Sequence, residues 1–170
     1  MTKRKIALIS TGGTVEKTYN ELEGVLHNQV SVLDVMLAKL QLEGVETVRV
    51  PLLNKDSLEM TEADHTLIAD TAGSMAATHD GVVITHGTDT LALSGNRAVE
   101  RLGTPRVPIV FTGAMKPYVM RSSDAMQNLT EAMLAVQILA PGVYVTLHNK
   151  VLQFPGVVKD RQRGTFVKEG

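Results

Sequence analysis

Residues 5–14 read KIALISTGGT, an apolar run that ends in two glycines among hydroxyl-bearing side chains. Residues 81–90, GVVITHGTDT, repeat this order of features. Short, nearly continuous aliphatic runs are typical of parallel strands that are covered on both faces. Ligands of open α/β sheets bind outside the carboxyl ends of such strands, so we expect the two polar loops to share one site.

The rest of the sequence alternates between strand and helix patterns. Strands are expected at residues 5–10, 47–52, 81–85, 107–112 and 142–147, and the third and fourth helices at 90–102 and 123–139. The first two helices are expected to start at capping boxes, SVLD at 31–34 and TEAD at 61–64. No linker divides the chain, so we predict one α/β domain over residues 1–170. Its doubly wound, mostly parallel sheet should carry helices on both faces.

Composition excludes several classes of function. The 170 residues carry a formal net charge of −1 and no long basic run, which disfavours a nucleic-acid partner. The absence of cysteine excludes disulfides, thiolate metal sites and cysteine nucleophiles. No apolar stretch approaches the roughly 18 residues of a membrane span, or the roughly 7–15 of a signal-peptide core behind residues 3–5. We therefore expect a cytoplasmic protein without a membrane partner.

The two loops allow catalytic and purely structural interpretations. A threonine nucleophile needs a proton acceptor and donors for the oxyanion, and Gly12 and Gly13 allow close approach of backbone N–H groups. The same glycines are also common in plain turns after strands. Asp89 is placed to cap the following helix, and His86 to make a structural hydrogen bond. The polar segment 16–29 is expected to be a mobile loop beside the site. Neither loop has a nucleotide-binding glycine pattern.

Three motifs in order, TGGT at 11–14, HGTDT at 86–90 and GAMKP at 113–117, resemble the signatures of bacterial-type L-asparaginases. The similarity spans nearly the whole chain. It corresponds to the N-terminal α/β domain of the larger enzymes, so the chain resembles a short, single-domain form without the C-terminal domain. The resemblance implies hydrolysis of L-asparagine to L-aspartate and ammonia through an acyl-enzyme, with neither metal nor organic cofactor.

The resemblance also implies roles for individual residues. Thr14 would be the nucleophile, with Tyr19 helping to accept its proton. Thr88, Asp89 and Lys159 would form a second group that activates water. The implied substrate-binding residues are Gly13, Ser57, Gly87, Thr88 and Asp89, and backbone N–H groups near Gly13 and Thr88 would hold the oxyanion.

Two of these assignments rest on position rather than on a motif. Lys159 is placed eight residues after the start of the Val151-Leu152 pair, with other basic residues nearby. Tyr19 is the only tyrosine in segment 16–29, but the aligned family position lies nearer Val25.

Departures from the family pattern leave the substrate and the assembly open. Leu58 replaces a glutamine of some relatives, and Lys116 replaces an arginine, which removes a planar bidentate donor. In larger relatives a neighbouring C-terminal domain supplies an acidic residue to the substrate amino group, so a homo-oligomer with a shared site is expected. The alternatives are a glutaminase-type amidase, an amidotransferase subunit, and a non-catalytic module that binds asparagine or aspartate.

Overall fold

A six-stranded sheet forms the centre of the computed structural model, which describes residues 2–27 and 31–170. Its order is β4-β1-β5-β6-β7-β8, and all neighbours are parallel except β7 and β8. The five predicted strands are present within this sheet. Its strands are β1 (Arg4–Gly12), β4 (Val45–Lys55), β5 (Gly81–Thr85), β6 (Pro108–Thr112), β7 (Gly142–Leu147) and β8 (Lys150–Gln153).

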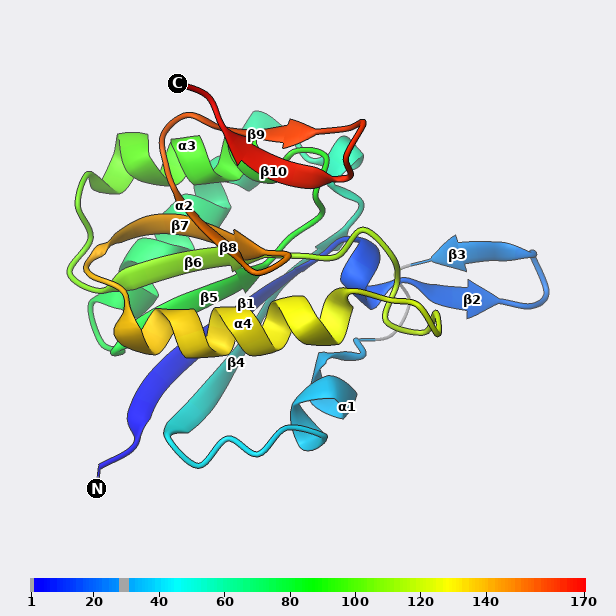
Figure 1. Cartoon of the computed structure of the whole chain (residues 1–170), viewed down its shortest axis with the longest axis horizontal. Helices are drawn as coiled ribbons and strands as arrows, with labels where there is room; N and C mark the ends of the chain where they lie inside the picture. The colour runs from blue at the N-terminus through cyan, green and yellow to red at the C-terminus, as the bar shows by residue number, and fades with distance from the viewer. Residues whose placement is uncertain (1, 28–30) are drawn as a thin grey trace.

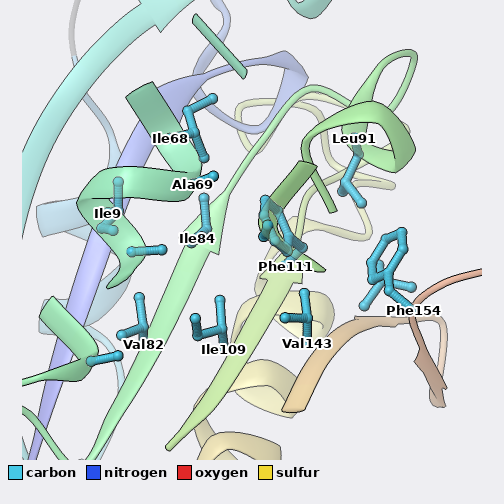
Figure 2. Close-up of a cluster of buried hydrophobic side chains, with 14 of the residues drawn as sticks. Ile9, Ile68, Ala69, Val82, Ile84, Leu91, Ile109, Phe111, Val143 and Phe154 are labelled. Carbon is cyan, nitrogen blue, oxygen red and sulfur yellow. The ribbon is translucent and has the colours of Figure 1, made fainter. Parts of the chain in front are cut away.

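Helices cover both faces of the sheet, as predicted (Figure 1). Alternate side chains of β1 point to opposite faces, so Ile6 and Leu8 pack with one pair of helices and Ala7 and Ile9 with the other. Figure 2 shows the second of these clusters, with Ile9 among the labelled core residues. The first pair is α1 (Leu33–Ala38) and α4 (Ala125–Ile138), and the second is α2 (Glu62–Ala76) and α3 (Leu91–Leu102). No helix of the described residues is long and apolar enough to cross a membrane.

One of the two predicted capping boxes is present. Thr61 Oγ1 accepts from the Asp64 N–H at 3.3 Å, and Asp64 Oδ2 accepts from the Thr61 N–H at 2.8 Å, at the start of α2. The prediction for residues 31–34 is wrong, because α1 begins at Leu33 with no side-chain cap. Ser31 instead donates to Glu16 Oε1 at 2.6 Å. The Ser31 hydroxyl therefore bonds to the buried carboxylate of Glu16, 15 residues away, and not to the start of α1 as local spacing predicted.

Short, partly exposed strands complete the fold, and the sequence pattern did not predict them. Segment 16–29, expected to be a loop, contains the hairpin of β2 (Thr18–Asn20) and β3 (Val25–His27), while its residues 28 and 29 lie outside the described part. This hairpin projects from the body of the molecule (Figure 1). A second hairpin, β9 (Val157–Asp160) with β10 (Thr165–Lys168), lies beside α3. It carries Lys159.

The two motif loops meet where the sheet reverses its winding. β1 pairs with β4 on one side and with β5 on the other, and such switch points open crevices outside the strand ends. Gly13 has φ +77° and donates its N–H to Lys55 O at 2.9 Å. A Cβ added to Gly13 would lie 2.5 Å from the backbone nitrogen of Gly87. Glycine therefore lets the two loops touch backbone to backbone.

The substitution Gly13→Ala tests this contact, with Gly103→Ala as a matched control. Both glycines have positive φ in a backbone region that costs an L-residue about 1–3 kcal/mol. Only at Gly13 would the new methyl group meet backbone, since no atom lies within 4 Å of it at Gly103. Urea unfolding is expected to show a larger loss of unfolding free energy for Gly13→Ala. Equal losses in the two variants would show that the loops do not depend on the close approach.

Candidate active site

Thr14 presents its hydroxyl at the first position of a short 3₁₀ helix, η1 (Thr14–Glu16). The side chain is partly buried, and the following residue, Val15, anchors the turn in the core. Within residues 2–27 and 31–170, neither the hydroxyl nor the backbone N–H of Thr14 has a hydrogen-bond partner. Both groups are therefore available to a ligand.

Lys159 lies against the second motif. Its Nζ donates to Thr88 Oγ1 at 2.8 Å and to Asp89 Oδ1 at 2.9 Å. Arg161 donates to the same Asp89 oxygen at 2.7 Å, whereas Lys150 donates to the Phe166 carbonyl instead. Strand β9 thus brings Lys159 to the two residues with which the family resemblance groups it. Arg161 joins them as a neighbour that received no separate role from the sequence.

Asp89 is held as an anion by these cations. The hydrogen bond from Lys159 is the largest cause that lowers the pKa of Asp89 below its ordinary value of 3.8, and Arg161 adds to the effect. Asp89 does not cap α3, whose N-cap is Thr90 without a side-chain cap. Both cations contact Oδ1, and no described residue bonds to Oδ2. One carboxylate oxygen therefore remains to accept from a ligand.

Ser57 is packed beneath the second motif. It starts the 3₁₀ helix η2 (Ser57–Glu59) and is almost fully buried. Its Oγ accepts from the Thr90 N–H at 3.3 Å, and its carbonyl accepts from Thr90 Oγ1 at 2.8 Å. A Cβ on Gly87 would lie 2.6 Å from the Ser57 Cβ and Oγ. Gly13, Gly87 and Ser57 are consequently one tightly packed group.

Tyr19 lies apart from this group. It sits on β2 opposite Leu26, with 64% of its surface exposed, and makes no hydrogen bond with Thr14. Val25, nearer the family position, is also exposed, at the start of β3. The structure does not bring either side chain to Thr14, and the role of Tyr19 stays a prediction.

His86 is buried behind the site. Its Nδ1 lies 2.7 Å from Gly87 O and its Nε2 lies 2.7 Å from Ser94 Oγ. Burial lowers the pKa of His86 to about 4, so the ring is neutral at pH 7. The structural interpretation of this histidine fits the geometry. Among the described residues, no cluster of three or more histidine or acidic side chains is arranged to hold a metal ion.

Sequence reasoning missed three charged residues around the loops. Glu16 is buried, and desolvation raises its pKa. Asp56 pairs with Lys17 at 2.6 Å, which joins η1 to η2, and this hydrogen bond lowers the pKa of Asp56. The available signal was position, because Glu16 and Lys17 directly follow the first motif and Asp56 directly precedes Ser57.

Comparisons with known proteins give one family. L-asparaginase of Thermococcus kodakarensis is 32% identical over 150 residues, which is 87% of this chain and 45% of that protein. A glutamyl-tRNA(Gln) amidotransferase subunit of Haloquadratum walsbyi is 37% identical over 145 residues, 84% of this chain and 33% of that one. The chain therefore spans less than half the length of these relatives.

Solved structures agree with this grouping. The thermostable L-asparaginase from Thermococcus kodakarensis superposes with a TM-score of 0.86 at 30% identity, over 96% of this chain and 51% of that chain. A probable cytoplasmic L-asparaginase from Campylobacter jejuni gives 0.79 at 29% identity, over 98% and 52%. The family model described as "Asparaginase, N-terminal" matches residues 5–165. The chain therefore belongs to the asparaginase family, and corresponds to its N-terminal domain.

Proposed function

We propose that the protein hydrolyses the side-chain amide of L-asparagine to give L-aspartate and ammonia. The observation that carries this proposal is the contact of Lys159 Nζ with Thr88 Oγ1 and Asp89 Oδ1, at 2.8 and 2.9 Å. This group lies on the loop whose Gly87 packs against Gly13, next to Thr14. A hydroxyl nucleophile and a second hydroxyl–carboxylate–amine group on adjoining loops suit two-step acyl transfer.

In the first step Thr14 Oγ1 attacks the amide carbonyl, and the carbon–nitrogen bond then breaks. The hydroxyl proton passes by way of Tyr19 to the departing nitrogen, which leaves as ammonia. The Gly13 N–H already donates to Lys55 O, so the oxyanion donors in this proposal are the N–H groups of Thr14 and Thr88, which have no acceptor among the described residues.

In the second step water cleaves the Thr14 ester, assisted by Thr88, Asp89 and Lys159. The Oδ2 of Asp89, to which no residue of the described ranges bonds, would accept from the α-ammonium of the substrate, and Ser57 would bind its α-carboxylate. Ser57 Oγ accepts from the Thr90 N–H and donates to no described residue, so its hydroxyl hydrogen is left for the substrate.

The assembly around this site belongs to the same proposal. The larger relatives extend beyond the matched region. We propose a cytoplasmic enzyme that acts as a homo-oligomer, in which a neighbouring copy contributes to the pocket. Light scattering of the purified protein measures its oligomeric state, and a monomer would contradict the proposed assembly.

A second candidate function is supply of ammonia within an amidotransferase. The amidotransferase protein of Haloquadratum walsbyi is identical to this chain at 37% of the aligned residues, and the Thermococcus L-asparaginase at 32%, so the two kinds of relative are about equally similar. Very slow hydrolysis by the isolated chain, restored by a partner protein, would favour this function. Comparable turnover of free asparagine and glutamine would favour a general amidase instead.

The variants Thr14→Ala and Thr88→Ala should separate the two steps. Loss of the nucleophile is expected to reduce ammonia release by at least about 1,000-fold. Thr88→Ala should instead release about one equivalent of ammonia in a rapid burst and then stall, because only water attack is impaired. Mass spectrometry should then find the acyl group on Thr14.

Thr78→Ala, on the loop after α2, is the control and should keep normal turnover. Near-normal turnover by the folded Thr14 and Thr88 variants would contradict the mechanism. Tight binding of asparagine by the wild type without ammonia would indicate a binding module.

Lys159→Met should make stability depend less on pH. The lowered pKa of Asp89 stabilises the folded state above pH 3.8, and this contribution is lost as pH falls through the lower folded-state pKa. The stability gap between wild type and variant is therefore expected to be larger at pH 7 than at pH 3. Urea unfolding across this range measures it. Lys150→Met removes a bond to a carbonyl, so its gap should not shrink on acidification. A constant gap for Lys159→Met would contradict the assignment.

A further inference from the structure

A buried chain of hydrogen bonds runs behind the second motif. His65, on α2, places Nδ1 at 2.7 Å from Ser94 Oγ, and Ser94, on α3, lies 2.7 Å from His86 Nε2. His86 Nδ1 then lies 2.7 Å from the carbonyl oxygen of Gly87. All three side chains are almost fully buried. None of them is used by the mechanism proposed above.

Only one assignment of donors and acceptors is consistent with all three hydrogen bonds. A carbonyl oxygen accepts and never donates, so His86 Nδ1 must carry a hydrogen for Gly87. Burial lowers the pKa of His86 to about 4, so its Nε2 carries no hydrogen at neutral pH and accepts from the Ser94 hydroxyl. Ser94 has then used its single hydrogen, so His65 Nδ1 must donate to Ser94 Oγ. Each donor in the chain points toward Gly87.

The last group in this series of hydrogen bonds, the Gly87 carbonyl, controls the direction of a backbone N–H. The Gly87 carbonyl and the Thr88 N–H belong to one peptide unit, which is trans. In a trans peptide these two groups point to opposite sides, so the bond from His86 turns the Thr88 N–H away from the histidine. No described residue accepts from that N–H. It is the same N–H that the acyl-transfer mechanism uses as an oxyanion donor.

We propose that His86, held in one tautomer by Ser94 and His65, is a positioning residue that aims the Thr88 N–H at the oxyanion. The role rests on the proposed function, since it concerns the transition state of that reaction. Neighbouring rings restrict the imidazole further. His65 stacks against it with ring centroids 6.2 Å apart, and Phe111 meets it edge-on at 6.1 Å.

The proton order can be measured without any turnover. In protein labelled with ¹⁵N-histidine, NMR is expected to show both His86 and His65 as neutral rings protonated at Nδ1. The Thr88 amide resonance should shift in His86→Leu, which fills similar space without a donor, and return toward the wild type in His86→Asn. The asparagine side chain keeps a donor near the position of Nδ1. An Nε2–H tautomer for His86, or a Thr88 resonance unaffected by His86→Leu, would overturn the proposal.

Kinetics test the consequence for catalysis. Removal of one oxyanion donor costs about 100- to 1,000-fold in kcat, so a misdirected one should cost about 10- to 100-fold. We expect this loss of kcat for His86→Leu, with KM changed less than about twofold and most of the loss recovered in His86→Asn. His79→Leu is the control, because His79 is buried in the turn that follows α2, where it bonds to the Met75 carbonyl, and its replacement should leave kcat unchanged.

The possible results separate the two proposals. A rise in KM with constant kcat, or equal impairment in His86→Leu and His86→Asn, would overturn the positioning role while leaving the asparaginase function intact. Absence of ammonia from the wild type would reject the asparaginase function. The tautomers and the Thr88 resonance would still decide whether the chain of hydrogen bonds orients the peptide. If His86→Leu does not fold, Ser94→Ala breaks the same chain with a smaller change in volume.

Discussion

The backbones of Gly13 and Gly87 touch at the switch point between β1 and β5, and the candidate site depends on this contact. A side chain at Gly13 would meet backbone, and one at Gly87 would meet Ser57. The three residues therefore lie closer than ordinary side-chain packing allows. Because main-chain atoms form the contact, the relative position of the two loops is set by the rigid sheet beneath them. The positions of Thr14 and Thr88 relative to each other are therefore fixed by the same contact.

The sequence predicted the buried half of the fold better than the exposed half. β1 and β5 were predicted because strands covered on both faces must be continuously apolar. β9 and β10 are short and partly exposed, so no periodic pattern identified them, and Lys159 was found only through the family resemblance. The Ser31 cap failed because Glu16, distant in sequence, competes for its hydroxyl. Contacts between distant residues are what local spacing does not encode.

The series of hydrogen bonds behind Gly87 also joins residues that are distant in sequence. His65 and Ser94 are 29 residues apart and lie on different helices, so nothing in the sequence joins them to the HGTDT motif. His86 was predicted to make a structural hydrogen bond, and it does. The packing of α2 against α3 adds the other two members, and the Gly87 carbonyl, which can only accept, requires that His86 Nδ1 carry the proton. In the proposal above, the structural hydrogen bond of His86 thereby orients the neighbouring Thr88 N–H.

The residues assigned to the site lie on two kinds of element, one packed into the core and one projecting from it. The wall formed by Gly87, Thr88 and the buried histidines is tied to the core, whereas Tyr19 is carried on a projecting two-stranded hairpin, an element of low intrinsic stability. In the proposed mechanism the first step needs Tyr19 to reach Thr14, and the second step needs only groups already in contact. The proposed acylation step therefore requires Tyr19 to lie closer to Thr14 than it does here, while the water-activating group needs no rearrangement. The two steps thus place different demands on the same fold.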